Sequence, residues 1–239
     1  MNTAIDATVR HNLLKEMGVL CCNTIGDIVA EPPLLNHRPG FRMTLHGVGG
    51  ARKYLNAAER QRFIRAAQHA PREIRLFCLT LVWGGARISE ALGVTAAAID
   101  LDRAVVTFKT LKRRAPGIVR EVPLPPRVVA DLNRAFGLRR LQRDPTLAYR
   151  RLWGWSRTTA WRYVKAVMRS AGLSGVAAVP KGLRHSFGVA AFRANIPPHL
   201  VQRWLGHASL ETTAIYADVS GPEEREFAAR MWRRSARRH

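Results

Sequence analysis

Residues 205–216 read Leu205-Gly206-His207-Ala208-Ser209-Leu210-Glu211-Thr212-Thr213-Ala214-Ile215-Tyr216, and they form the most informative segment of the chain. A tyrosine next to an isoleucine is usually an ordinary amphipathic position. Here, however, the tyrosine follows Leu-Gly-His, a serine and two threonines in a pattern too long to arise often by chance. The glycine is typical of a residue that ends a helix, so we expect a helix over 198–205.

The composition indicates a folded protein that binds a polyanion. The chain has 239 residues, of which 47% are hydrophobic and 23% charged, enough for one large domain or two modest ones. Its 39 lysines and arginines exceed its 17 acidic residues and give a net charge of +22. Such a charge favours salt-dependent binding to nucleic acid. Composition alone leaves open a structural basic protein of the ribosomal type and an enzyme that acts on DNA.

The sequence lacks the signals that are typical of several classes of protein. No basic segment precedes an apolar run at the N-terminus, and the most apolar stretch, 76–83, is too short to span a bilayer. We therefore expect a soluble, cytoplasmic protein with no membrane partner. Cys21, Cys22 and Cys78 have no CxxC spacing, and the eight histidines form no HExxH pattern. We expect no disulfide framework, no metal site and no cofactor, so any chemistry on phosphate would depend on side chains.

Sequence patterning divides the chain into three parts. Residues 1–50 are weakly patterned, with two adjacent prolines and several glycines, which indicates an N-terminal arm or linker. Residues 51–232 carry regular periodicity and form the predicted domain, and residues 233–239 form a basic C-terminal tail.

The domain is predicted to be mainly α-helical with one small antiparallel β-sheet, an α+β fold. Asn56 and Glu59 have capping-box spacing at the start of a first helix, and apolar residues at helical spacing predict a second one over 72–84. Two β-rich runs, 104–108 and 119–124, flank a basic loop, which favours a hairpin with a cationic tip. Further helices are predicted over 156–171, 183–194 and 198–205 and after Ser220, which has capping-box spacing with Glu223.

Two places are expected to contact DNA phosphates. One is the hairpin tip, with Lys112, Arg113 and Arg114. The other is the helix over 156–171, whose basic face contains Arg157, Arg162 and Lys165. The apolar face of the same helix is predicted to consist of Trp161, Val164, Val167 and Met168.

Cleavage of a phosphodiester without a metal requires a nucleophile, cations on the nonbridging oxygens and a proton donor for the departing oxygen. Four segments that offer such groups resemble, in the same order, the motifs of the tyrosine recombinase or phage integrase family. They are Gly84-Gly85-Ala86-Arg87-Ile88-Ser89-Glu90-Ala91-Leu92, the hairpin with Lys109, Gly182-Leu183-Arg184-His185-Ser186-Phe187, and Leu205 to Tyr216. The resemblance covers about residues 50–230 and implies that family's catalytic-domain fold for 51–232.

The resemblance also implies a role for each reactive residue. Tyr216 would attack phosphorus and form a 3′-phosphotyrosyl bond. Arg87 and Arg184 match the two arginines of the family, and a planar guanidinium suits two nonbridging oxygens at once. Lys109 matches the lysine that protonates the 5′ leaving oxygen, and Lys112 is an alternative in the same loop. For Arg87, a structural ion pair with the nearby Glu90 is the competing interpretation.

Two histidine positions need separate interpretation. His207 matches a family position that hydrogen-bonds the phosphate, which an imidazole N–H can do. The family usually has a histidine three residues before the second arginine, where this chain has Lys181. A lysine can donate to phosphate but is a poor base while protonated, so the proton acceptor for Tyr216 is left open. His185, next to Arg184, is interpreted as structural.

The sequence therefore predicts a site-specific DNA recombinase of the integrase, invertase or resolvase type. The expected partner is double-stranded DNA with specific recombination sites, bound by a homotetramer in the nucleoid. Free of DNA, the chain is expected to be a monomer or a weak oligomer. In that tetramer a helix after Tyr216 would dock on a neighbouring protomer through Phe227 and Met231. The family generally has a separate N-terminal DNA-binding domain, where this chain has only the short arm. Three alternatives follow: the catalytic domain binds DNA with the short arm, an accessory DNA-binding protein contributes the missing contacts, or the chain is a truncated form. The alternatives are a type IB topoisomerase-like enzyme and a non-cleaving DNA-binding regulator.

Overall fold

The computed structural model describes residues 44–110, 118–217, 225 and 229. Within this part of the chain, no helix is long and apolar enough to cross a membrane. Some sequence predictions concern residues outside these ranges: most of the N-terminal arm, Lys112, Arg113 and Arg114 of the loop, the helix after Ser220 with Phe227 and Met231, and the tail 233–239.

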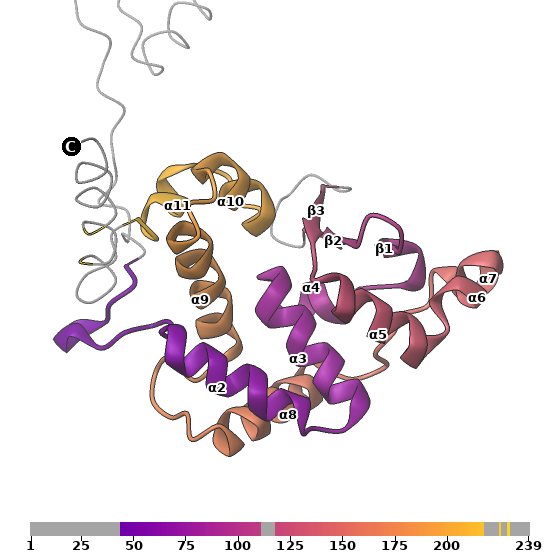
Figure 1. Ribbon diagram of the computed structural model, residues 1–239, viewed down its shortest axis with the longest axis horizontal. Coiled ribbons are helices and arrows are strands. Elements are labelled where there is room, and N and C mark those ends of the chain that lie inside the picture. Colours follow the sequence, from indigo (N-terminus) through magenta and orange to yellow (C-terminus); the bar gives the residue numbers. More distant parts are fainter. Residues whose placement is uncertain (1–43, 111–117, 218–224, 226–228, 230–239) are drawn as a thin grey trace, which may run out of the picture. The chain divides into compact units, whose positions relative to one another are not determined.

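The described residues form mostly helices and one small antiparallel sheet, which confirms the predicted fold class (Figure 1). The helices are α2 (Ala57–Gln68), α3 (Arg72–Gly84), α4 (Ile88–Leu92), α5 (Pro126–Phe136), α6 (Leu138–Arg143), α7 (Pro145–Ala148), α8 (Arg157–Ser170), α9 (Pro180–Arg193), α10 (Pro198–Leu205) and α11 (Glu211–Ala214). Two short 3₁₀ turns, η1 (Val48–Gly50) and η2 (Ala96–Ala98), accompany them. The sheet has the order β1 (Ile99–Asp100), β2 (Val105–Lys109), β3 (Val119–Pro123).

Helix α3 is the centre of the core. It packs against α2, α5 and α9, and every residue from Leu76 to Val82 is buried. Trp153 is fully buried beside Phe77 and donates its indole N–H to the carbonyl of Glu73 at 3.2 Å. Burial of large aromatic side chains contributes much of the stability of such a core, provided that their polar atoms find partners. The helix ends at Gly85 in a left-handed conformation (φ 57°), as the predicted Gly84-Gly85 stop requires.

The predicted start of α2 is confirmed in atomic detail. The Asn56 side chain accepts a hydrogen bond from the Glu59 N–H at 2.8 Å, and the Glu59 carboxylate accepts one from the Asn56 N–H at 2.8 Å. This reciprocal pair satisfies two of the N–H groups that a helix leaves without partners at its first turn. The strand predictions also agree with β2 and β3 to within one residue at each end.

The predicted apolar face of α8 is wrong at one position. Trp161 keeps 43% of its surface exposed, whereas Ala160 is fully buried in the core with Val164 and Met168. The helix is therefore rotated so that its buried stripe passes through the small alanine, and the tryptophan is left in a cleft described below. Helix α9 also begins earlier than predicted, at Pro180, since proline is well suited to the first helical position.

Candidate active site

One cleft of about 830 Å³ is lined by most of the predicted catalytic residues. Its lining includes Arg87, Lys181, Arg184, His207 and Tyr216, which are five of the six predicted catalytic residues. Lys109 is not among the lining residues; it is exposed at the end of β2, opposite Val119, while the next residue, Thr110, lines the cleft. Arg157 and Trp161 of α8 contribute to the same cleft.

Arg87 lies at the N-cap of α4, at the boundary between a turn and a helix. Its backbone N–H donates to the Glu90 carboxylate at 2.8 Å, and its guanidinium donates to the same carboxylate at 2.7 Å. The ion pair considered from sequence is therefore present. About 29% of the Arg87 side chain remains exposed toward the cleft, so the pairing leaves part of the guanidinium accessible to a ligand.

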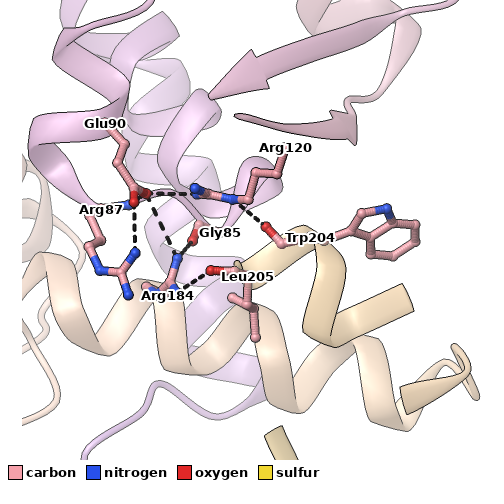
Figure 2. Close-up of polar contacts among 7 residues, drawn as sticks. All are labelled: Gly85, Arg87, Glu90, Arg120, Arg184, Trp204 and Leu205. Atoms are coloured by element: carbon pink, nitrogen blue, oxygen red, sulfur yellow. Dashed lines mark hydrogen bonds and ion pairs between the residues drawn. The ribbon is translucent and has the colours of Figure 1, made fainter. Parts of the chain in front are cut away.

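Arg184 is the buried member of the arginine pair. Its guanidinium donates to the backbone carbonyl of Gly85, at 2.7 Å, and to that of Leu205 (Figure 2). These contacts join the turn before α4 to the end of α10, so that the segments with Arg87 and His207 are fixed to α9. Burial, followed by the charges of Arg87 and Arg120, lowers the pKa of Arg184 to about 9, so its guanidinium is still charged at neutral pH.

Glu90 is the buried carboxylate behind these arginines. Its side chain is fully buried and lies 2.7 Å from Arg87, 2.7 Å from Arg120 and 3.9 Å from Arg184 (Figure 2). Burial alone would raise the pKa of Glu90, but hydrogen bonds and charge from Arg120 and Arg87 outweigh it and hold the pKa below its usual value. Three guanidinium groups around one carboxylate leave this cluster with an excess of two positive charges, and two of its arginines, Arg87 and Arg184, line the cleft.

Arg120 was not predicted as a site residue. It lies on β3 with 4% of its surface exposed, stacks over the Phe108 ring and donates to the carbonyl of Trp204 at 2.6 Å. Because it also binds Glu90, this one side chain connects the hairpin to α10 and α4. A sequence signal was present: Arg120 is in phase with the buried Val122 of the alternating strand, so its side chain had to point inward.

Tyr216 follows α11, and its side chain is fully buried. Its hydroxyl lies 3.1 Å from Nδ1 of His185, and its ring is nearly parallel to that of His207, at an interplanar angle of 14°. Burial raises the pKa of Tyr216 to about 12, although the charges of Arg184 and Arg87 act in the opposite direction. His185, which the sequence led us to interpret as structural, therefore contacts the very oxygen that the resemblance implies is reactive.

His207 is held by the second threonine of the C-terminal motif. Its Nδ1 lies 2.9 Å from the Thr213 hydroxyl, and Thr213 is itself buried. Burial, then the charges of Arg184 and Arg87, lowers the pKa of His207 to about 3, so the ring is neutral near pH 7. A neutral imidazole fixed through Nδ1 has Nε2 as the nitrogen available to a ligand.

The residues predicted to contact DNA differ in how far their side chains are exposed. Arg157 and Arg162 are exposed, and Arg157 lines the cleft. Lys165 is partly buried and donates to the carbonyl of Ala178 at 2.6 Å, which fixes the loop that leads into α9. In the described part of the chain, no group of three or more His, Cys, Asp or Glu side chains is placed to hold a metal ion.

Residues 53–222 match the model of the phage integrase family. The chain belongs to this family. Among its relatives, tyrosine recombinase XerD of Neisseria meningitidis serogroup B is 33% identical over 138 residues, which cover 57% of this chain and 47% of the relative. Tyrosine recombinase XerA of Pyrococcus furiosus is 30% identical over 160 residues, covering 65% and 54%. The chain thus spans about half the length of the relatives it matches.

Solved structures support the same fold. The crystal structure of XerA recombinase superimposes with a TM-score of 0.62 at 24% identity, over 74% of this chain and 64% of that one. XerH site-specific recombinase bound to its difH substrate before cleavage gives a TM-score of 0.60 at 24% identity, over 80% and 55%. The fold of the described residues is therefore the catalytic-domain fold of tyrosine recombinases.

Proposed function

We propose that this chain cleaves and rejoins DNA as a site-specific recombinase, through a 3′-phosphotyrosine intermediate at Tyr216. The observation that supports this proposal most directly is the cleft that Tyr216 shares with Arg87, Arg184 and His207. A scissile phosphate in that cleft would meet a nucleophile, two guanidinium groups and a neutral imidazole. These are the groups that phosphoryl transfer needs when side chains alone carry it.

In the proposed cleavage step, the Tyr216 hydroxyl loses its proton to a base, and its oxygen forms a bond to phosphorus as the bond from phosphorus to the 5′ oxygen breaks. Lys109, at the exposed end of β2, supplies a proton to the departing oxygen. Rejoining reverses these events when a 5′-hydroxyl attacks the phosphotyrosine. The phosphodiester gains negative charge as it becomes five-coordinate, and the excess of two positive charges around Glu90 is suited to stabilise that change.

The proposed substrate is duplex DNA with specific recombination sites, and the proposed active assembly is a homotetramer, with an accessory DNA-binding protein as a further candidate partner. Exposed arginines of α8, Arg157 and Arg162, would contact phosphates beside the cleft. These contacts would position the duplex, and they carry no sequence information by themselves.

The test is covalent trapping. A nicked suicide duplex, with a site selected from random DNA by its binding to the protein, is incubated with the wild-type chain in EDTA. We expect a covalent adduct with wild type and none with Tyr216→Phe, which should still bind the DNA because it keeps the ring packed beside His207. An adduct that persists in Tyr216→Phe would identify another nucleophile and refute the assignment. Specific binding without any wild-type adduct would favour a non-cleaving regulator, a function with which the full burial of Tyr216 is compatible.

A further inference from the structure

Building on the proposed function, we propose that His185 is a catalytic residue that accepts the proton of Tyr216 as the tyrosine attacks phosphorus. In this step the Tyr216 oxygen bonds to phosphorus, the bond to the 5′ oxygen breaks, and the proton of the tyrosine hydroxyl passes to Nδ1 of His185. In the rejoining step the same nitrogen returns the proton to the tyrosine. Lys109 exchanges the other proton, with the 5′ oxygen.

The direction of the hydrogen bond follows from counting donors and acceptors. Nδ1 of His185 and the Tyr216 hydroxyl are 3.1 Å apart and both side chains are buried. Nε2 of His185 has no partner among the described residues. If Nδ1 carried a proton, both the Tyr216 O–H and the Nε2 lone pair would lack partners among the described residues. If Tyr216 donates to Nδ1, only the Nε2–H lacks such a partner. The second arrangement leaves fewer unsatisfied buried groups, so it is the favoured one.

Burial and the surrounding positive charges keep the His185 ring neutral, so that it can accept a proton. It is faced by Lys181 and Arg184 of its own helix, by Lys53 and by the ring of His207. Burial, followed by the charges of Lys181, Arg184 and Lys53, lowers the pKa of His185 to about 4, so the ring is a neutral acceptor at pH 7. The tyrosine oxygen changes from a phenol to a nearly non-basic ester oxygen during attack. A base of intermediate strength can therefore take the proton in the transition state, while the incoming phosphate offsets the surrounding positive charge.

The other candidates for this role fit less well. Lys181 lies one turn before His185 on α9, but an ammonium group has no lone pair with which to accept a proton. His207 uses Nδ1 for Thr213, and its ring is stacked almost parallel to that of Tyr216, with centroids 6.1 Å apart. This chain thus has Lys181 where the family usually has a histidine. One helical turn later it has His185, which contacts the proposed nucleophile Tyr216.

The test compares two substitutions in single-turnover adduct formation on the suicide duplex. His185→Asn can still hydrogen-bond Tyr216 but cannot take up a proton. If His185 is the base, we expect adduct formation to slow by about 10²-fold or more with DNA affinity unchanged. In His185→Ala, added imidazole should restore the rate, and more basic substituted imidazoles should restore it further. A residue that only holds the tyrosine in place would show no such dependence on basicity.

A measurement on the unaltered chain keeps the inference testable if both variants fold poorly. On a substrate with a 5′-sulfur leaving group, which needs no proton from Lys109, wild-type cleavage should still be slower in deuterium oxide. Absence of that isotope effect, or a His185→Asn variant that cleaves as fast as wild type, would overturn the role of His185. Neither result would affect the proposed function, which falls only if wild type forms no adduct that depends on Tyr216.

Discussion

At the scale of single residues, the carboxylate of Glu90 lies beside the two arginines, Arg87 and Arg184, that we propose bind the phosphate. It is the group that Arg87 binds twice, and it also pairs with the buried Arg120. A buried ion pair adds little net stability by itself, but removing one partner leaves a buried charge without compensation. Here the loss of Glu90 would leave three neighbouring guanidinium groups with no counter-charge among these contacts.

We therefore expect Glu90→Gln to lower the free energy of unfolding at pH 7 by about 3–5 kcal/mol, the usual cost of breaking a buried pair from one side. The pKa of Glu90 is lowered in the folded state, so its contribution is complete above the unfolded-state value and is lost as the pH falls below it. The difference between wild type and Glu90→Gln should thus shrink when urea unfolding is repeated below about pH 4.5.

Glu121 offers a matched control for this substitution. Its carboxylate is 57% exposed and lies 3.7 Å from Arg103, so Glu121→Gln should change the unfolding free energy little at either pH. Equal effects of Glu90→Gln and Glu121→Gln at pH 7 would mean that the arginine cluster does not depend on its buried carboxylate.

The sequence identified the residues of the cleft better than the residues that hold them. Arg87, Arg184, His207 and Tyr216 could be predicted because each lies in one of the segments that resemble the family's motifs. Arg120 appeared to be one more of the many basic residues, and only its phase within a two-stranded hairpin marked it as inward. The contact of His185 with Tyr216 joins residues 31 positions apart in the chain, and no local pattern predicts such a pair.

At the scale of elements, prediction succeeded where a helix is buried on one side and capped. The capping box of α2 and the apolar spacing of α3 are local signals, and both helices begin where those signals place them. Helix α9 is different, because every residue from Gly182 to Val189 is buried. A helix buried on all sides has no amphipathic period, so its start was misplaced and its contact faces could not be predicted.

One consequence of the burial of α9 concerns Gly188. A Cβ atom at this position would lie 2.7 Å from the Tyr216 ring, so the close approach of helix and ring requires glycine. We expect Gly188→Ala to displace the ring and slow adduct formation on the suicide duplex by about 10²-fold, the scale of loss for a misplaced reacting group. DNA affinity should be retained, because Arg157 and the other exposed basic residues are unchanged.

Gly154 serves as the control for an added methyl group. A Cβ atom there would meet nothing within 4 Å, so Gly154→Ala should match wild type in both binding and adduct formation. A Gly188→Ala variant that forms adduct at the wild-type rate would show that Tyr216 reacts from a position other than the buried one described here.

At the scale of the whole molecule, the distribution of charge directs a polyanion to the cleft. The described residues that line it include Arg87, Arg157, Lys181 and Arg184, and none of the lining residues is acidic. Glu90 lies behind this surface, fully buried. With a net charge of +22 over the chain, long-range attraction and local phosphate contacts act in the same direction.

This charge predicts that DNA binding depends steeply on salt, since each phosphate neutralised by a lysine or arginine releases condensed counterions. Between about 50 and 200 mM salt we expect the affinity for a duplex to fall by about 10³-fold or more, the loss typical of six or more phosphate contacts.

Arg157→Gln should weaken binding and reduce the slope of log affinity against log salt by about 0.9, the value of one contact. Arg143 is the matched control: it is exposed on α6, at the end of the molecule away from α9, α10 and α11 (Figure 1), so Arg143→Gln should leave the slope unchanged. A flat salt dependence for wild type would contradict phosphate-driven binding. Equal slopes for wild type and Arg157→Gln would place the DNA away from this side of the cleft.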